Sequence, residues 1–182
     1  MPPRTKITKE MIVAAAYDLV RTEGIGKLTA RSVADKLGCS TQPVLYNYAT
    51  IDDIKKEAYE KADMYHSEYI MPKGRAGMNP LLELGLNYVR FGYEEKMLLQ
   101  FLFQTDQFSG MTLSGLVENP LLGQILELVS KGAGISIEEA KEMFLSIFIT
   151  AHGCASLLAG NAMEYEEERI ISILTNSMKR AK

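Results

Sequence analysis

Side chains that can donate or accept hydrogen bonds gather between residues 29 and 48 of the chain. Gln42 can offer a donor and an acceptor together, as the major-groove edge of an adenine requires. Arg31 can reach a phosphate or the edge of a guanine, and the hydroxyl groups around it can donate to phosphate oxygens. The residues that we expect to contact DNA are Thr29, Arg31, Ser40, Thr41, Gln42, Tyr46, Tyr48 and Lys55.

Some of these assignments have a plainer alternative. Tyr46 and Tyr48 can be ordinary half-buried surface aromatics, and Lys55 can lie on a solvated helix face where opposite charges pair. We expect Leu45 to pack inward on the first helix of the chain. Val44 either packs inward or touches a thymine methyl group.

The stretch that carries these side chains has the pattern of two short helices joined by a tight turn. Thr29 is a good N-cap for the first helix, and Gly38 ends that helix because Gly takes the left-handed conformation at the least cost. Ser40 can cap a second helix that runs to Tyr48, with Pro43 tolerated in its first turn. This order is the helix-turn-helix unit, whose second helix lies in the major groove.

The segment from Lys6 to Ala62 resembles the DNA-binding domain of TetR-family transcriptional regulators, in the order helix, LTARSVADKLG, CSTQPVLYNY, long helix. Ser40, the pair Leu45-Tyr46 and the aromatic Tyr48 carry the likeness. The resemblance implies DNA contacts at Thr29, Arg31, Ser40, Gln42, Tyr46 and Tyr48. Ala49 stands where members usually have Phe, so the alternative is a TetR-like helical protein that binds a protein partner instead of DNA.

Charge is distributed unevenly along the chain. The whole sequence has a net charge of -3, which argues against a general nucleic-acid binder. Residues 1–51, however, hold seven Lys and Arg against four acids, so they carry +3 and the remaining 131 residues carry -6. A basic front and an acidic body fit a protein that touches phosphates at one end only.

The sequence predicts an all-α fold, with an N-terminal three-helix helix-turn-helix DNA-binding domain and a larger C-terminal helical ligand-binding and dimerisation domain. A packing helix from Thr8 to about Glu23 precedes the two-helix unit. We assign residues 1–50 to the DNA-binding domain, 51–71 to a connecting helix and 72–182 to the C-terminal domain. Two Pro and two Gly between residues 71 and 80 interrupt the helical pattern after the connecting helix.

From Pro80 onward the helices are apolar on several faces, so they must be covered on more than one side. We expect a small-molecule effector to bind within these helices and weaken DNA binding. For each of these residues taken alone, core packing is the plainer interpretation. The candidate effector-binding residues are Tyr88, Phe91, Phe103, Gln104, Phe108, Phe144 and Phe148.

Residues 143–163 form the longest stretch without Asp, Glu, Lys or Arg. It is long enough to cross a bilayer, but scattered polar residues and the absence of an aromatic belt favour a helix buried between its own domain and a partner subunit. The last helix is predicted from Glu164 to Lys182. The resemblance implies a homodimer formed by these last two helices, with interface residues Ser146, Thr150, Gly153, Cys154, Leu157, Ile170, Ile173, Leu174 and Ser177.

Nothing in the sequence has the pattern of a catalytic or metal site, and we expect no enzyme, no cofactor and no catalytic residue. His152 and Cys154 lie two positions apart, so on a helix they point in different directions. Cys39 and Cys154 fit no metal-ligand spacing and favour a reducing cytoplasm, with a redox role for Cys39 as the alternative. We therefore expect a cytoplasmic, ligand-responsive transcriptional regulator, a repressor on a palindromic operator.

Overall fold

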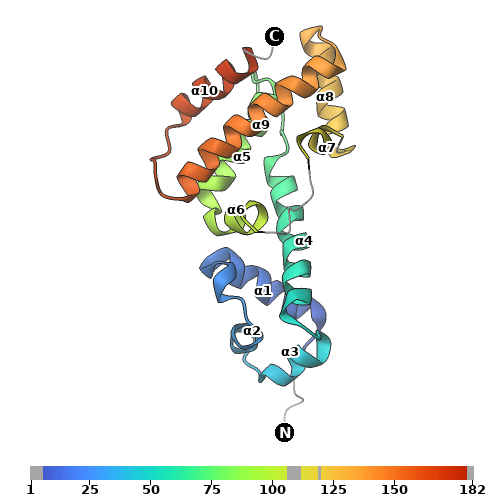
Figure 1. The fold of residues 1–182 in the computed structure, drawn as a ribbon, viewed down its shortest axis with the longest axis vertical. Helices are drawn as coiled ribbons and strands as arrows, with labels where there is room; N and C mark the ends of the chain where they lie inside the picture. The colour runs from blue at the N-terminus through green and yellow to red at the C-terminus, as the bar shows by residue number, and fades with distance from the viewer. Residues whose placement is uncertain (1–5, 106–111, 119, 180–182) are drawn as a thin grey trace.

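The computed structural model of the protein describes residues 6–105, 112–118 and 120–179, and every regular element within these ranges is helical (Figure 1). The all-α prediction is therefore confirmed. The helices are α1 (Lys9–Glu23), α2 (Ala30–Lys36), α3 (Thr41–Asn47), α4 (Ile51–Ile70), α5 (Pro80–Glu94), α6 (Lys96–Phe103), α7 (Leu113–Val117), α8 (Pro120–Ala133), α9 (Ile137–Ala159) and α10 (Glu167–Lys179), with a short 3-10 turn at Ile25–Lys27.

Side-chain caps set the helix starts near the N-terminal end. The Thr8 hydroxyl accepts from the backbone N–H of Met11 at 3.3 Å and begins α1. Thr29 and Ser32 exchange hydrogen bonds in a capping box at the start of α2. Gly38 has a φ of 65°, a left-handed conformation that Gly adopts without the steric cost of a Cβ. The predicted helix-turn-helix is therefore present.

The last two helices differ from the prediction in their limits. Ser136 and Glu139 form a capping box, so α9 begins at Ile137, well before the apolar stretch. The helix stops at Ala159, and Asn161 has a left-handed φ of 54° just beyond it. The apolar stretch thus outlasts the helix. The acidic residues from Glu164 to Glu166 precede α10, which begins at Glu167.

In Figure 1, helices α1 to α3 form one end of an elongated molecule and α4 runs from them into the body built by α5 to α10. One buried apolar cluster runs through both parts, from Ile12 and Val44 to Leu99, Ala155 and Leu174. A second one joins α5, α8 and α9. The end that carries α3 therefore packs against the body through this shared core.

Helices α5 and α9 form the centre of the body and approach closely at two glycines. A Cβ at Gly92 would lie 2.9 Å from Cα of Ala155, and a Cβ at Gly85 would lie 2.6 Å from a methyl carbon of Ile147. Among the described helices, α9 alone has the length and composition of a membrane span. That is weak support for a span, because core helices meet the same criteria, and α9 contributes to both apolar clusters.

Candidate DNA interface and C-terminal sites

Helix α3 turns one polar face outward at the end of the molecule. Ser40, Thr41 and Gln42 are exposed, and Tyr46 is 90% exposed although it is a large aromatic side chain. On the opposite face Val44 is fully buried and joins the core cluster. Helix α3 thus packs on the core through Val44 and leaves Tyr46 in solvent.

Tyr48 does not lie on this face, which corrects its predicted DNA contact. Its side chain is 4% exposed, and its hydroxyl donates to a carboxylate oxygen of Glu57 at 2.8 Å. Burial, together with the bond to Glu57, raises the pKa of Tyr48 well above its usual value. Lys9 lies over the ring, 4.9 Å from its centroid. Tyr48 thus fixes the end of α3 to α4, and its hydroxyl is already paired.

Leu45 also differs from the prediction, which had it packing inward. It is 53% exposed, whereas Val44 and Tyr48, four residues apart, take the buried face. With 3.6 residues per turn only one of the two neighbours can face the core, and the spacing to Tyr48 selects Val44. Leu45 therefore adds an apolar group to the exposed face.

The other predicted DNA contacts lie beside α3. The Thr29 hydroxyl is exposed but belongs to the capping box of α2. Arg31 is exposed, with Asp35 3.9 Å away on the next turn. Lys55 donates to Asp52 at 2.8 Å. This agrees with the alternative interpretation of Lys55, a solvated helix face on which opposite charges pair. Arg31 is thus available to a partner, while Lys55 would first have to leave Asp52.

An ion pair joins the helix-turn-helix end to the body. Arg21, in the last turn of α1, donates through two guanidinium nitrogens to the Glu95 carboxylate, one of the bonds measuring 2.8 Å. The Tyr65 hydroxyl of α4 donates to the same carboxylate at 3.1 Å. Glu95 lies between α5 and α6. The hydrogen bond to Glu95 raises the pKa of Arg21, so the guanidinium stays charged. The sequence analysis missed this contact because its residues are 74 positions apart.

The predicted effector-binding aromatics meet where α4, α5, α6 and α9 converge. The ring of Tyr88 lies between those of Phe103 and Phe148 as a neighbour of both, with centroid distances of 5.7 Å to each. Phe91 and Phe144 are buried beside them. Gln104 is exposed at the end of α6, so it is not part of this group. Phe108 lies outside the described residues.

Two histidines that the sequence analysis did not assign belong to the same group. We use the name aromatic cluster for His66, Tyr88, Phe91, Phe103, Phe148 and His152. Nδ1 of His152 and the Tyr88 hydroxyl share a hydrogen bond of 2.8 Å. His66 is 6% exposed, and burial lowers its pKa to about 4, so its ring is neutral at pH 7.

Both histidines continue a spacing of four that was visible in the sequence. Ile54, Ala58 and Ala62 lead to His66 on α4, and Phe144 and Phe148 lead to His152 on α9. Positions four apart share a helix face. The apolar stripes therefore place both histidine rings on buried helix faces, a signal that is easily missed because His is a polar residue.

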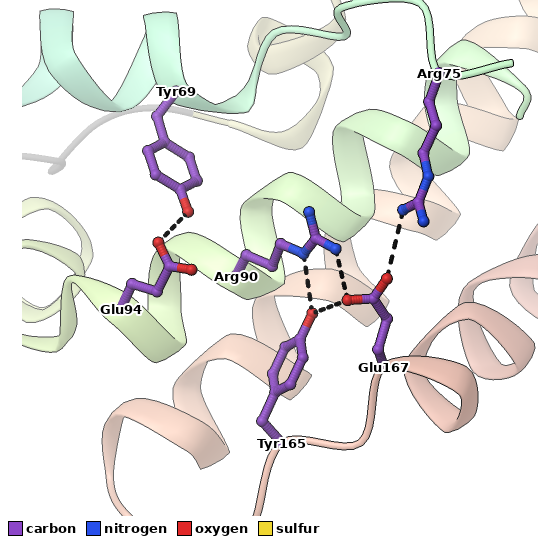
Figure 2. Close-up of polar contacts among 6 residues, drawn as sticks. All are labelled: Tyr69, Arg75, Arg90, Glu94, Tyr165 and Glu167. Atoms are coloured by element: carbon purple, nitrogen blue, oxygen red, sulfur yellow. Dashed lines mark hydrogen bonds and ion pairs between the residues drawn. The ribbon is translucent and has the colours of Figure 1, made fainter.

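A second polar group fixes the start of α10 to α5 (Figure 2). Arg90 of α5 donates to Glu167 at 2.5 Å and to the Tyr165 hydroxyl at 3.2 Å. Arg75, from the segment after α4, reaches the other oxygen of Glu167 at 3.4 Å. Figure 2 also shows the Tyr69 hydroxyl donating to Glu94, which links α4 to α5. These contacts hold the body together around α5.

The predicted dimer residues divide into two groups. Three of them, Gly153, Leu157 and Ile173, are exposed, and four are half-buried: Ser146, Thr150, Cys154 and Ser177. Ile170 and Leu174 are buried against α5 and α9, which corrects their assignment to a subunit interface. On α10 the inward positions are thus 170 and 174, and position 173 faces out.

Metal-ligating side chains do not gather in the described ranges, where no three His, Cys, Asp or Glu residues are placed to hold a metal ion.

No protein-family model matches the sequence, and a search of curated proteins returned no match. Among solved structures, a TetR-like transcriptional regulator from Rhodococcus sp. RHA1 has a TM-score of 0.64 at 18% sequence identity. The alignment covers 99% of this chain and 97% of that one. The protein therefore has an all-helical fold with a helix-turn-helix at one end. More particularly, this is the TetR-like fold.

Proposed function

We propose that the protein is a transcriptional regulator that binds a palindromic operator as a homodimer, through α2 and α3. The exposed face of α3 carries this proposal: Gln42, Leu45 and Tyr46 project from it, while Val44 and Tyr48 anchor it from behind. Gln42 is suited to read adenine, Leu45 to touch a thymine methyl group, and Tyr46 to hold a phosphate.

A homodimer supplies the second reading head. Pairing of α9 and α10 with the same helices of another copy would cover Leu157 and Ile173, which are exposed in the single chain. A two-fold dimer places its recognition helices about one turn of DNA apart, or a multiple of it, so the operator has matching half-sites. Repression follows where such an operator overlaps a promoter.

The effector acts from the aromatic cluster. The cluster draws its rings from α4, α5, α6 and α9, and Glu95, at the α5–α6 junction, is bonded to Arg21 of α1. A molecule that prefers one placement of α4 and α6 would shift α1 to α3 through the contact between Arg21 and Glu95. This shift would weaken DNA binding. We place the protein in the cytoplasm, where both DNA and small metabolites are available.

Gel-shift titration tests the proposal. Purified full-length protein is titrated against fragments of the DNA flanking its own gene at two salt concentrations. The proposal expects saturable binding to one fragment, weakened by at least about 100-fold between 50 and 200 mM salt because several phosphate contacts release counterions. Binding to no fragment would refute the proposed function. It would favour the alternative that follows from Ala49 in place of the usual Phe, a TetR-like helical protein that binds a protein partner instead of DNA.

A further inference from the structure

A cavity of about 310 Å³ lies between the segment that follows α4 and one face of α5. Three of its seven lining residues are cations, namely Lys73, Arg75 and Arg90, and Glu83 is the one acid among the seven. The chain after residue 51 is acidic as a whole, with a net charge of -6. A basic cavity in an acidic body is a local exception and favours an anionic ligand.

The acid of this cavity already has its partners. Glu83 is 6% exposed, and its two carboxylate oxygens accept from the backbone N–H groups of Lys73 and Arg75, at 2.9 Å each. Burial raises the pKa of Glu83, but these N–H groups bring it below its usual value, so the carboxylate is ionised at pH 7. Asn87 donates to the carbonyl oxygen of Ile70 at 3.3 Å. Two side chains of α5 thus fix the backbone that carries Lys73 and Arg75, and the site is preorganised.

The cations of the cavity have more donors than their described partners use. One terminal nitrogen of Arg75 and one of Arg90 donate to Glu167, at 3.4 Å and 2.5 Å, and Nε of Arg90 donates to the Tyr165 hydroxyl. The other terminal nitrogen of Arg90 contacts none of the residues drawn in Figure 2. The exposed Lys73 side chain forms no ion pair or hydrogen bond within the described ranges. Donors therefore remain for a second carboxylate beside Glu167.

The rest of the wall suits the apolar part of a ligand. The ring of Tyr69 is half-buried at the end of α4, and Leu86 is buried on the facing side of α5. The Tyr69 hydroxyl is bonded at 2.6 Å to Glu94, an exposed residue outside the lining set, so Tyr69 offers its ring to the cavity. The three cations exceed Glu83 and Glu167 by one charge. A single carboxylate balances that excess.

We propose that this cavity binds a small aromatic monocarboxylate, whose carboxylate group bonds to Lys73, Arg75 and Arg90 and whose ring lies against Tyr69. Guanidinium groups match the planar geometry of a carboxylate, and Glu167 shows that these two accept one. The site is separate from the aromatic cluster, and its occupancy does not require DNA.

Isothermal titration of the full chain with benzoate, benzamide and inorganic phosphate, without DNA, tests this assignment. Benzamide has the shape of benzoate without its charge, and phosphate has charge without a ring. Benzoate should bind at least about tenfold more tightly than either, because it alone pairs with the cations and covers Tyr69. Failure of benzoate to bind, or equal binding of benzamide or phosphate, would overturn the proposal.

Lys73→Met then locates the carboxylate without disturbing the contacts of Glu167. Benzoate affinity should fall about fivefold in Lys73→Met and stay close to the wild-type value in Lys73→Arg, which keeps the charge. Lys131→Met is the matched control, since Lys131 is an exposed cation of α8 outside the cavity and its loss changes the net charge equally. Unchanged affinity in Lys73→Met, or an equal loss in Lys131→Met, would show that the carboxylate is not bound here.

Discussion

Gln42 and Tyr46 are neighbours on one exposed face of α3, yet we expect them to have different roles in DNA binding. Gln42→Ala should remove base discrimination, costing about 1–3 kcal/mol on the matched operator and little on a scrambled one. Tyr46→Phe removes one hydroxyl from a phosphate contact and should weaken both by about 1 kcal/mol. Parallel titrations on matched and scrambled fragments measure both effects. Equal losses from Gln42→Ala on the two fragments would show that its assigned role is wrong.

The buried His66 makes the unfolding free energy depend on pH. Burial lowers the pKa of His66 from 6.5 to about 4, so between these values the unfolded chain binds a proton that the folded one excludes. The unfolding free energy is therefore unaffected by His66 above about pH 6.5. As the pH falls toward 4, it decreases by about 3 kcal/mol in total. The pKa of His152 is lowered in the same direction, also by burial.

Urea denaturation at pH 7 and at about pH 4.5 measures this loss. His66→Gln has no proton to take up, so its unfolding free energy should fall less than that of the wild type over the same pH interval. Identical pH dependence for the two proteins would mean that His66 is solvated in the folded state.

At the scale of elements, the contact between α5 and α9 depends on Gly92. An added Cβ there would lie 2.6 Å from Cβ of Ala155 and 3.0 Å from its carbonyl oxygen, too close for either helix to stay in place. We expect Gly92→Ala to cost about 1–3 kcal/mol of unfolding free energy. Gly123→Ala is the control, because Gly123 lies inside α8 with open space around it, and it should stabilise by up to about 1 kcal/mol. Thermal unfolding of the two variants measures both changes in stability. Equal midpoints for Gly92→Ala and Gly123→Ala would show that α5 and α9 do not approach closely at Gly92.

The sequence predicts where helices begin and end better than which side of each helix faces the core. Caps and glycines are local signals, so Thr8, Thr29 and Gly38 mark helix ends correctly. Which side of a helix faces the core depends on neighbours distant in the chain. This is why Leu45 was assigned inward although its neighbour Val44 takes that place.

The same limit applies to the sites. Tyr48 matched a family pattern for DNA contact, but its ring fits against α4 and its hydroxyl pairs with Glu57. Ile170 and Leu174 were placed at a subunit interface, although α5 and α9 bury them within one chain. His66 and Glu95 are polar residues in apolar surroundings, and only the folded arrangement reveals their partners or the lack of one.

On the scale of the whole molecule, Arg21 and Glu95 connect α1, at the helix-turn-helix end, to the α5–α6 junction of the body. Arg21→Met leaves a largely buried carboxylate with the Tyr65 hydroxyl as its remaining described partner. We expect a loss of about 1–2 kcal/mol of stability, moderated by the partial exposure of Arg21. The fold-change that an effector produces in operator affinity should shrink as well.

Arg31→Met is the matched control for stability. Its side chain is 87% exposed and its ion pair is long, so its loss should leave the unfolding free energy unchanged. Equal destabilisation by the two variants, or a full effector response in Arg21→Met, would contradict the assigned coupling.

Two copies of α3 that read one two-fold operator should leave a symmetric footprint on the fragment identified by gel shift. We expect two protected half-sites of matching sequence, centred about one DNA turn apart or a multiple of it. Leu157→Glu places a charge at an exposed apolar position of α9 and should break the dimer, so both half-sites should lose protection together. A single protected site that survives in Leu157→Glu, or no protection at all, would rule out reading by a two-fold dimer.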